Sequence, residues 1–254
     1  MGTMVEFKRP DGQMASGWLA EAQNAVASVV VIQEWWGLNE QIRGVAERLA
    51  SAGFSALVPD LYKGKSTVEA EEAHHLMTGL DFADAASNDV RGAVQFLKAR
   101  GTGSGTGSGT GTGTGTGSGA GTGTGTGKVG VTGYCMGGAL TVLALTMVPE
   151  VDAGVVWYGL PPLEYVDASK IGARPVLAHW ALQDQAFGID QVDALEARFL
   201  DAKVRYEGHR YLAQHGFANE TALGPRRIPI TQYDPVWAQQ AWDRTMRFFG
   251  QQLT

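Results

Sequence analysis

The chain of 254 residues contains a single cysteine, Cys135. One cysteine cannot form an intramolecular disulfide, and it cannot build a zinc or iron–sulfur site that needs several thiolates. These absences exclude a small disulfide-stabilised scaffold and a multi-cysteine metal centre. They leave the thiol of Cys135 as a group whose position in the fold has to be explained.

The sequence also lacks long apolar segments and basic clusters. Its longest purely aliphatic run, Val29 to Ile32, is far shorter than the ~20 residues of a membrane span. Residues 1–13 contain charges and a turn but no apolar stretch typical of a secretion signal. The formal net charge is -6, from 26 acidic and 20 basic residues, which argues against nucleic-acid or membrane-surface binding. We therefore expect a soluble, cytoplasmic protein that binds no nucleic acid and no membrane.

One segment has an unusual composition. From residue 101 to residue 127 every odd position is glycine, and the even positions hold nine Thr, three Ser and one Ala. Strict alternation does not provide the glycine spacing of dinucleotide-binding or P-loop motifs. We interpret residues 101–127 as a flexible low-complexity loop without chemistry, inserted in one domain that spans residues 1–254.

Strand and helix patterns alternate along the rest of the chain. Residues 4–8 and 13–19, joined by Pro10-Asp11-Gly12, predict an antiparallel hairpin. Asn39 and Asp234 are typical helix N-caps, and Gly53 is typical of a helix end. The further predicted strands are 25–33, 54–58, 129–132, 154–158, 175–180 and 204–212, and the predicted helices are 40–52, 69–77, 88–99, 136–147, 190–200 and 235–249. This alternation predicts an α/β fold, with a mostly parallel central sheet covered by helices on both faces.

Cys135 lies in the motif Gly133-Tyr134-Cys135-Met136-Gly137-Gly138, between a predicted strand and a predicted helix. This is the context of the nucleophile elbow, G-x-S-x-G, with cysteine in the serine position. The turn is so sharp that the residues two before and two after the nucleophile cannot carry side chains. The N-terminus of the following helix favours a thiolate. A lone cysteine is otherwise most often a small buried apolar residue, but this context favours a nucleophile.

In an elbow hydrolase the acid and then the histidine follow the nucleophile along the chain. Three histidines follow Cys135. His215 comes just after a predicted strand, in a loop that can place the ring over the thiol, and it is the preferred base. His209 lies within that strand and is the alternative, whereas His179 lies in an apolar strand and is expected in the core.

Asp184 is the preferred acid because it lies in the loop directly after the predicted strand 175–180. Asp190 and Asp193 lie on the next helix, where carboxylates are commonly solvated. Glu34 also follows a buried strand at the same sheet edge, just before Trp35-Trp36-Gly37. It could act in catalysis, or it could be an exposed loop carboxylate. This loop is the source of an oxyanion-hole amide in such folds.

Together these motifs resemble the dienelactone hydrolase family of the α/β-hydrolase superfamily. The resemblance rests on residues 33–37, 58–62 and 133–138, on Asp184, and on His215-Gly216-Phe217. It implies a Cys135–His215–Asp184 triad, with Glu34 contacting the thiol and helping to form the thiolate. It also implies an oxyanion hole made by the backbone N–H groups of Met136 and Trp35, and no cofactor or metal.

The chain departs from the family at the position four residues after His215. Family members that open an anionic lactone hold the substrate carboxylate there with an arginine, and this chain has Asn219. A second arginine would come from the segment after Asp60, but none occurs between Arg48 and Arg91; Lys63 or Lys65 could substitute. Asn219 also begins an Asn-x-Thr glycosylation triplet, which we interpret as coincidental. We expect Trp36, Tyr134 and Asn219 to contact the substrate.

These observations predict a hydrolase of carboxylic esters or lactones that acts through an acyl-enzyme and favours uncharged substrates. Alternatives within the same chemistry are a carboxymethylenebutenolidase acting on anionic dienelactone and a promiscuous thioester or phosphotriester hydrolase. Outside it, the scaffold could belong to a non-catalytic binding protein or to a thiol-based redox protein, although no second cysteine is present to resolve an oxidised thiol. We expect a small-molecule substrate and a monomer or small homo-oligomer.

Overall fold

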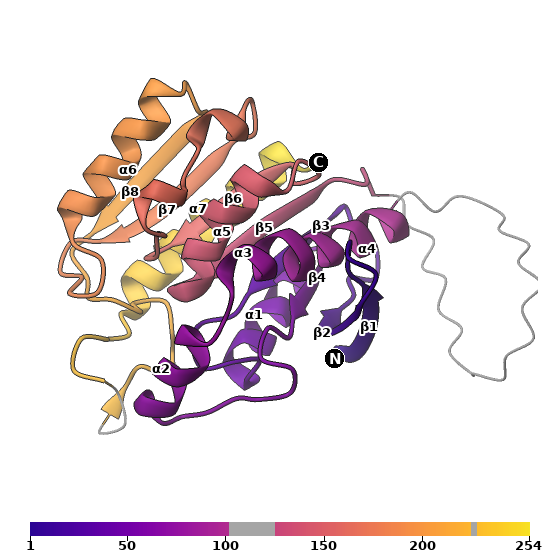
Figure 1. The fold of residues 1–254 in the computed structure, drawn as a ribbon, viewed down its shortest axis with the longest axis horizontal. Coiled ribbons are helices and arrows are strands. Elements are labelled where there is room, and N and C mark those ends of the chain that lie inside the picture. Colours follow the sequence, from indigo (N-terminus) through magenta and orange to yellow (C-terminus); the bar gives the residue numbers. More distant parts are fainter. Residues whose placement is uncertain (102–124, 225–227) are drawn as a thin grey trace, which may run out of the picture.

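The computed structural model describes residues 1–101, 125–224 and 228–254, so most of the predicted Gly/Thr loop lies outside the described residues. An eight-stranded sheet forms the centre, with the strand order β1-β2-β4-β3-β5-β6-β7-β8 (Figure 1). The strands are β1 (Thr3–Lys8), β2 (Met14–Ala20), β3 (Ala27–Ile32), β4 (Phe54–Pro59), β5 (Val129–Tyr134), β6 (Ala153–Trp157), β7 (Val176–Ala181) and β8 (Tyr206–Tyr211).

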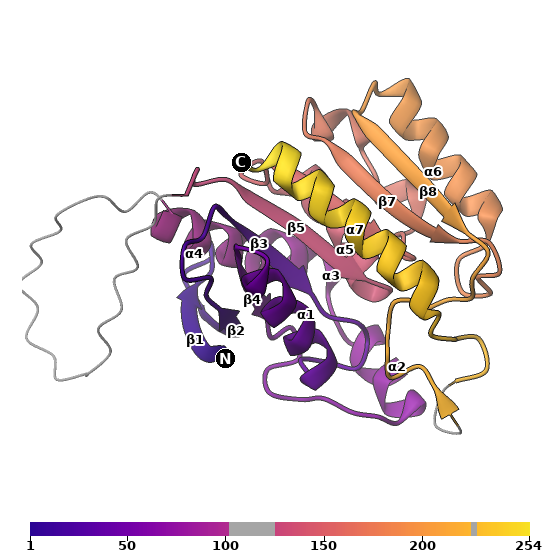
Figure 2. The same ribbon diagram turned by 180° about the vertical axis from the view of Figure 1, so that it is seen from behind.

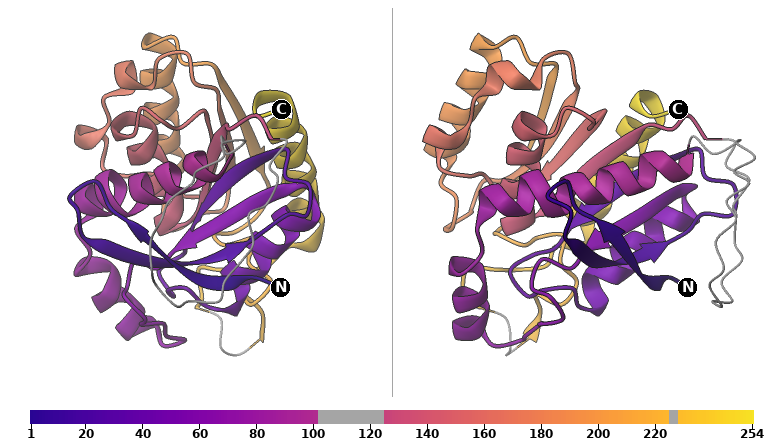
Figure 3. Two further views of the ribbon diagram at one scale, coloured as in Figure 1. Left: turned by 90° about the vertical axis from the view of Figure 1, so that its right-hand side faces the viewer. Right: turned by 45° about the vertical axis from the view of Figure 1, so that its right-hand side comes forward.

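The sheet is mostly parallel, as the sequence predicts. The predicted hairpin is confirmed by the antiparallel pairing of β1 with β2, and β2 pairs antiparallel with β4. All pairs from β4 through β3 to β8 are parallel. Figure 3 views the molecule from the hairpin end, with β1 and β2 nearest the reader. Because six neighbouring strands run in one direction, their carboxyl ends meet at one edge of the sheet.

Helices cover both faces of the sheet. Helices α4, α5 and α6 lie in front of the sheet in Figure 1, and α1 and α7 lie on the opposite face, which Figure 2 shows. The helices are α1 (Glu40–Ser51), α2 (Ala70–Thr78), α3 (Phe82–Asp84), α4 (Arg91–Gly101), α5 (Met136–Met147), α6 (Ile189–Asp201) and α7 (Pro235–Gln252). Within the described residues, none of these helices combines the length and apolar character needed to cross a bilayer.

Two apolar clusters fill the space between the sheet and its helices. In β3, Val30 and Ile32 face the cluster under α4, α5 and α6, whereas Val29 and Val31 face the cluster under α1 and α7. All four side chains are completely buried. Successive residues of a strand point to opposite faces, so a strand covered on both sides must be apolar throughout. Each such side chain contributes about 1.5–3 kcal/mol by leaving water.

The predicted caps form at both helices. The Asn39 side chain accepts a hydrogen bond from the Ile42 N–H, and Asp234 accepts from two N–H groups at the start of α7. Gly53 follows Ala52, the C-cap of α1, and has a φ of 93°, a conformation that glycine adopts without strain. The prediction for the end of α7 is wrong, because the helix continues past Gly250 to Gln252. Its packing against the sheet through Phe249 and Leu253 outweighs the helix-ending tendency of glycine.

The predicted helix 88–99 divides into two parts. Residues Ala85–Val90 form a π-helix, and α4 begins only at Arg91. The buried Arg9 guanidinium contacts Asp84 at 2.8 Å and Asp89 at 3.1 Å. A π-helix has a wider turn than an α-helix, so residues five apart come closer to one face. This ion-pair cluster joins the β1–β2 hairpin to the helical layer. No local sequence pattern predicts it.

The two ends of the Gly/Thr segment meet. A Cβ atom added to Gly101, the last residue of α4, would lie 3.1 Å from the Cα atom of Gly127. Gly127 lies just before β5, at the amino-end edge of the sheet and therefore opposite the edge where the parallel strands end. Gly101 and Gly127, the first and last residues of the repetitive segment, therefore lie side by side.

We expect replacement of residues 101–127 by about five residues to preserve activity. The shorter connection should raise the free energy of unfolding by about 1 kcal/mol, since closing a shorter loop costs less entropy. Urea denaturation and ester turnover of the shortened chain test this. Lost turnover in a chain that still unfolds cooperatively would contradict the interpretation of the segment as a loop without chemistry.

Candidate active site

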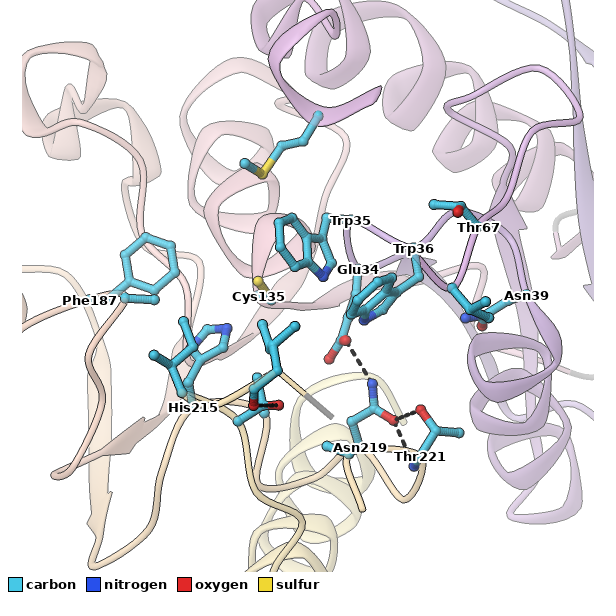
Figure 4. A pocket seen from close by; sticks show the side chains of 18 residues that line it. Glu34, Trp35, Trp36, Asn39, Thr67, Cys135, Phe187, His215, Asn219 and Thr221 are labelled. Carbon is cyan, nitrogen blue, oxygen red and sulfur yellow. Dashed lines mark hydrogen bonds between the residues drawn. The ribbon is translucent and has the colours of Figure 1, made fainter. Parts of the chain in front are cut away.

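The four residues predicted for catalysis gather at the carboxyl edge of the sheet. Glu34 follows β3, Cys135 follows β5, Asp184 follows β7 and His215 follows β8. Open parallel sheets bind ligands at this edge, because the loops that leave the strands there are free to form a crevice. Cys135, His215 and Glu34 line one cavity (Figure 4). Asp184 does not line it but contacts the His215 ring.

The turn that carries Cys135 is a strained elbow. Cys135 has a φ of 54°, an uncommon value for a residue with a side chain. A Cβ atom on Gly133 would lie 2.1 Å from the Gly137 carbonyl oxygen, and one on Gly137 would lie 2.3 Å from the Ile32 carbonyl oxygen. Real Cβ contacts are not that short, so the steric reason predicted for the two glycines is confirmed.

The segment after β6 supports the elbow from beneath. The Cys135 N–H donates to the Trp157 carbonyl at 3.0 Å. A Cβ atom on Gly159 would lie 1.8 Å from the Cys135 carbonyl oxygen, so this backbone approaches as closely as a glycine allows. Between them lies Tyr158, whose φ of 35° is also strained. Strain of this kind persists only where surrounding packing imposes it, and it is concentrated at functional sites.

His215 is held on both sides. Its Nδ1 lies 2.8 Å from Asp184 Oδ2, and both side chains are almost completely buried. Asp184 Oδ1 accepts the N–H groups of Ala186 and Phe187 at 2.8 and 2.9 Å, which fixes the carboxylate. The His215 carbonyl accepts the Gln232 N–H, so the backbone of this loop is fixed as well.

The surroundings of His215 favour its charged form. Burial disfavours an imidazolium, but Cys135 and the hydrogen-bonded Asp184 carboxylate outweigh it, so the pKa of His215 is raised well above its ordinary value. An imidazolium held beside Cys135 and the Asp184 carboxylate is the state in which the ring can later donate a proton. The geometry therefore suits general acid–base chemistry at Cys135.

The other histidines after Cys135 lie outside this arrangement. His179, in β7, is completely buried and contacts the Tyr211 hydroxyl and the Thr245 hydroxyl, each at 2.9 Å. Burial lowers the pKa of His179 well below its ordinary value, so it stays neutral. His209, in β8, contacts Glu207 at 2.7 Å near the surface. The expectation that His179 belongs to the core is confirmed.

Glu34 is buried in the cavity wall and receives two neutral donors. Its Oε1 accepts from the Tyr158 hydroxyl at 3.2 Å, and its Oε2 accepts from Asn219 Nδ2 at 2.8 Å (Figure 4). Burial raises the pKa of Glu34 above its ordinary value, although Asn219, His215 and Tyr158 act in the opposite direction. Within the described residues its carboxyl makes these two hydrogen bonds and none to Cys135, which differs from the expected contact with the thiol.

Two backbone amides are available beside Cys135. Met136 is the first residue of α5, and helices leave their first N–H groups without an intrahelical acceptor. Trp35 follows Glu34 in the loop after β3. Within the part of the chain that the structure describes, neither of these N–H groups hydrogen-bonds to another residue. Both amides predicted for the oxyanion hole therefore keep a donor unused.

The cavity has a volume of about 490 Å³ and a largely apolar wall. Trp36 and Asn39 line it from the loop after β3, and the segment after β8 lines the opposite side. No lysine or arginine occurs among the lining residues that the structure describes. These are Glu34, Trp35, Trp36, Asn39, Thr67, Val68, Met77, Cys135, Ala186, Phe187, His215, Gly216, Asn219, Thr221, Ala222, Ile228, Ile230 and Thr231.

One of the three expected substrate contacts needs correction. Tyr134 is 3% exposed and stacks on Trp157 within the cluster under α1 and α7, so it does not line the cavity. Alternation along β5 explains this, since Val129 and Val131 face the α5 side and Tyr134 faces the other. Asn219 does line the cavity, but its amide is used within the protein. Trp36 lies in the wall as predicted.

The sequence analysis missed several residues of the site. Tyr158 follows a strand at the same edge as Glu34, and that position was the available signal. Phe187, Ile228 and Ile230 are apolar loop residues, and nothing in their local pattern distinguishes them from other loop residues. Phe187 lies 5.7 Å from the His215 ring, centre to centre.

Comparison with known proteins agrees with this fold. The chain is 32% identical to protein usf of Aquifex pyrophilus over the full length of both. It is 30% identical to an Aquifex aeolicus protein that its name assigns provisionally to the carboxymethylenebutenolidases, over 98% of each chain. A dienelactone hydrolase-like promiscuous phosphotriesterase from metagenomic libraries has the same fold, with a TM-score of 0.78, 22% identity and at least 99% of each chain covered.

The fold and the site define an α/β-hydrolase, and the predicted fold class is confirmed. A family model for dienelactone hydrolases matches residues 15–110 and 120–253. The chain belongs to the dienelactone hydrolase family. It is accordingly an enzyme of the ester and lactone hydrolase class.

We expect His215→Ala to lower kcat/KM for ester hydrolysis by at least ~100-fold, the usual scale for a general acid–base residue. His209→Ala should leave turnover within a few-fold and change the free energy of unfolding by less than about 1 kcal/mol. His179→Ala should cost about 2–4 kcal/mol of stability, because it leaves two buried hydroxyls and a cavity. Steady-state kinetics and urea denaturation check all three, and inactive but stable His209→Ala would contradict the assignment.

Proposed function

We propose that this protein hydrolyses uncharged carboxylic esters or lactones through an acyl-enzyme on Cys135. One observation carries the proposal: the His215 ring lies between Asp184 and the cysteine of a strained elbow, in the wall of an apolar cavity. A nucleophile, its base and a carboxylate that orients the base are the parts that acyl transfer needs.

In the first half-reaction the Cys135 thiolate attacks the ester carbonyl carbon. The carbon–sulfur bond forms as the carbonyl electrons move to oxygen, where the N–H groups of Met136 and Trp35 would stabilise the negative charge. His215 then gives its proton to the leaving alkoxide, and the carbon–oxygen bond breaks. An alcohol leaves, and a thioester remains on Cys135.

In the second half-reaction His215 takes a proton from water, and the resulting hydroxide attacks the thioester carbonyl. The same two amides would stabilise the second tetrahedral intermediate. When the carbon–sulfur bond breaks, the carboxylic acid leaves and the thiolate is restored beside protonated His215. Asp184 remains ionised throughout, and it keeps the ring oriented and stabilises the imidazolium.

We assign to Glu34 a part in forming the thiolate: it takes the thiol proton when substrate enters, and it returns that proton to the sulfur after the carboxylic acid has left. Its carboxyl lies in the cavity wall, and its raised pKa makes it a better proton acceptor than an exposed carboxylate would be. To reach the thiol, Glu34 has to release one of its two present partners, Tyr158 or Asn219. The loop after β3 thus contributes both a titratable group and the Trp35 amide.

The preference for uncharged substrates is inferred from the cavity wall. A carboxylate entering the cavity would lose water, and no described lining residue carries a positive charge to receive it. Lys63 and Lys65, considered from the sequence as substitutes for an arginine clamp, are not among the lining residues. Asn219 turns its NH₂ group to Glu34. An unpaired charge taken out of water is costly, so a neutral acyl group should bind better.

The main alternative is the hydrolysis of an anionic dienelactone. The provisional name of the Aquifex aeolicus relative points to that activity for that protein. A matched pair of substrates separates the two possibilities, because p-nitrophenyl butyrate and p-nitrophenyl hemisuccinate differ mainly in a terminal methyl or carboxylate group. A non-catalytic binding protein would turn over neither ester.

We expect Cys135→Ala to abolish ester turnover while the protein stays folded, because one small side chain changes. Iodoacetamide should inactivate the wild-type enzyme with one label per chain, and mass spectrometry should place that label on Cys135. The alanine variant should take up no label and should keep the free energy of unfolding of the wild type to within about 1 kcal/mol. Full turnover by Cys135→Ala would disprove the proposed nucleophile.

We expect kcat/KM for the butyrate ester to exceed that for the hemisuccinate ester by ~10-fold or more, equal to about 1.4 kcal/mol of discrimination. The difference should lie mainly in KM, since the charged end is remote from the reacting carbonyl. The comparison needs two salt concentrations, because screening weakens attraction to exposed charges. A higher kcat/KM for the hemisuccinate ester, reduced by added salt, would show that a basic group attracts the substrate to this cavity.

A further inference from the structure

Asn219, Glu220 and Thr221 have the pattern of a glycosylation triplet, but the structure gives this pattern another use. Asn219 is 3% exposed and lies in the cavity wall, so its amide is enclosed by protein. Its Oδ1 accepts two hydrogen bonds from Thr221, from the backbone N–H at 2.9 Å and from the hydroxyl at 2.6 Å. Figure 4 shows the hydrogen bonds that connect the three residues, from Glu34 through Asn219 to Thr221.

The two ends of an asparagine amide have opposite hydrogen-bonding roles. The oxygen accepts and the nitrogen donates, and the group can rotate by half a turn to exchange them. Thr221 offers two donors on one side of Asn219, so the oxygen has to face Thr221. The NH₂ group then faces Glu34 Oε2, at 2.8 Å. If the amide turned over, two acceptor oxygens would meet in a buried place, which is unfavourable.

We propose that Thr221 is a positioning residue for the active site: its hydroxyl and backbone N–H fix the direction of the Asn219 amide, and the amide thereby presents a donor to Glu34. This inference deepens the proposed function because it concerns the carboxyl that we assign to thiol activation. Thr221 does not touch the thiol, and it acts through Asn219.

The groups that face Glu34 come from several elements. Tyr158 donates from the segment after β6, Asn219 donates from the loop after β8, and His215 lies in the same loop. Cys135 lies on the elbow, and Glu220 adds a negative charge near the site. A donor to a carboxylate stabilises its charged form, so loss of the Asn219 donor should raise the pKa of Glu34 further.

Infrared difference spectroscopy measures this directly. A protonated carboxyl group gives a carbonyl stretching band, and the band that is missing from the spectrum of Glu34→Gln belongs to Glu34. The loss of this band with rising pH reports the titration of Glu34. Thr221→Val removes the hydroxyl and keeps a side chain of the same shape. Thr221→Ser keeps the hydroxyl and is the matched control, and Thr221→Ala repeats the loss with a smaller side chain.

We expect the Glu34 titration in Thr221→Val and Thr221→Ala to lie about one pH unit above that of the wild type, with Thr221→Ser within about 0.3 unit of it. When the rate of Cys135 alkylation by iodoacetamide is measured against pH, its profile should contain an inflection that depends on Glu34. This inflection should move by the same amount and in the same direction as the titration. An equal titration in Thr221→Val and the wild type would overturn the proposal. So would an alkylation shift that persists when Thr221→Val is combined with Glu34→Gln.

Neither readout requires ester turnover, so the outcome is independent of whether the proposed substrate class is right. If no ester is hydrolysed but the titrations shift as expected, the positioning role stands and the proposed function fails. If esters are hydrolysed and the titrations do not shift, the proposed function stands and the positioning role of Thr221 fails. Urea denaturation of each variant confirms that the compared proteins are folded.

Discussion

The close contact between the elbow and its neighbouring backbone is the constraint on which the site depends. Cys135 has a φ of 54°, and around it the backbone packs so closely that no Cβ atom fits. Gly133 faces the Gly137 carbonyl, Gly137 faces the Ile32 carbonyl, and Gly159 faces the Cys135 carbonyl. These contacts join β5, α5 and the end of β6 into one rigid unit. A nucleophile fixed in this way needs little reorganisation when it reacts, and the strain is sustained by the apolar clusters on both sides of the sheet.

The electrostatics of the site divide into a charged part and a neutral part. His215 is buried between Cys135 and the Asp184 carboxylate, and these two neighbours raise its pKa well above the ordinary value. Glu34 is different, because its hydrogen-bond donors are the hydroxyl of Tyr158 and the amide of Asn219, and neither carries a charge. A buried carboxyl with neutral donors keeps its proton to higher pH than one beside a guanidinium. An arginine in place of Asn219 would add a positive charge to the cavity wall.

Much of this arrangement could be predicted from the sequence, and the reasons are physical. Strand periodicity gives the sheet, and parallel strands bring Glu34, Cys135, Asp184 and His215 to one edge without further information. The glycines of the elbow point to Cys135 as the candidate nucleophile. Chain contacts over long distances were beyond prediction: Tyr158 and Asn219 meet Glu34 from segments 124 and 185 residues away. The inward face of Tyr134 was also missed, because at the end of a strand the direction of the last side chain depends on the register.

The meeting of Gly101 and Gly127 has a consequence for how the chain can be rearranged. Two backbone points this close, at the edge of the sheet opposite the cavity, form a junction at which a second domain can be inserted between α4 and β5. Folded domains commonly have their own termini close together, and such junctions accept them. A fluorescent or ligand-binding domain placed there would be carried by α4 and β5, far from the thiol. Strand β5 leads directly to the elbow. A conformational change in the inserted domain that displaces the first residue of β5 would therefore be transmitted along this strand to Cys135.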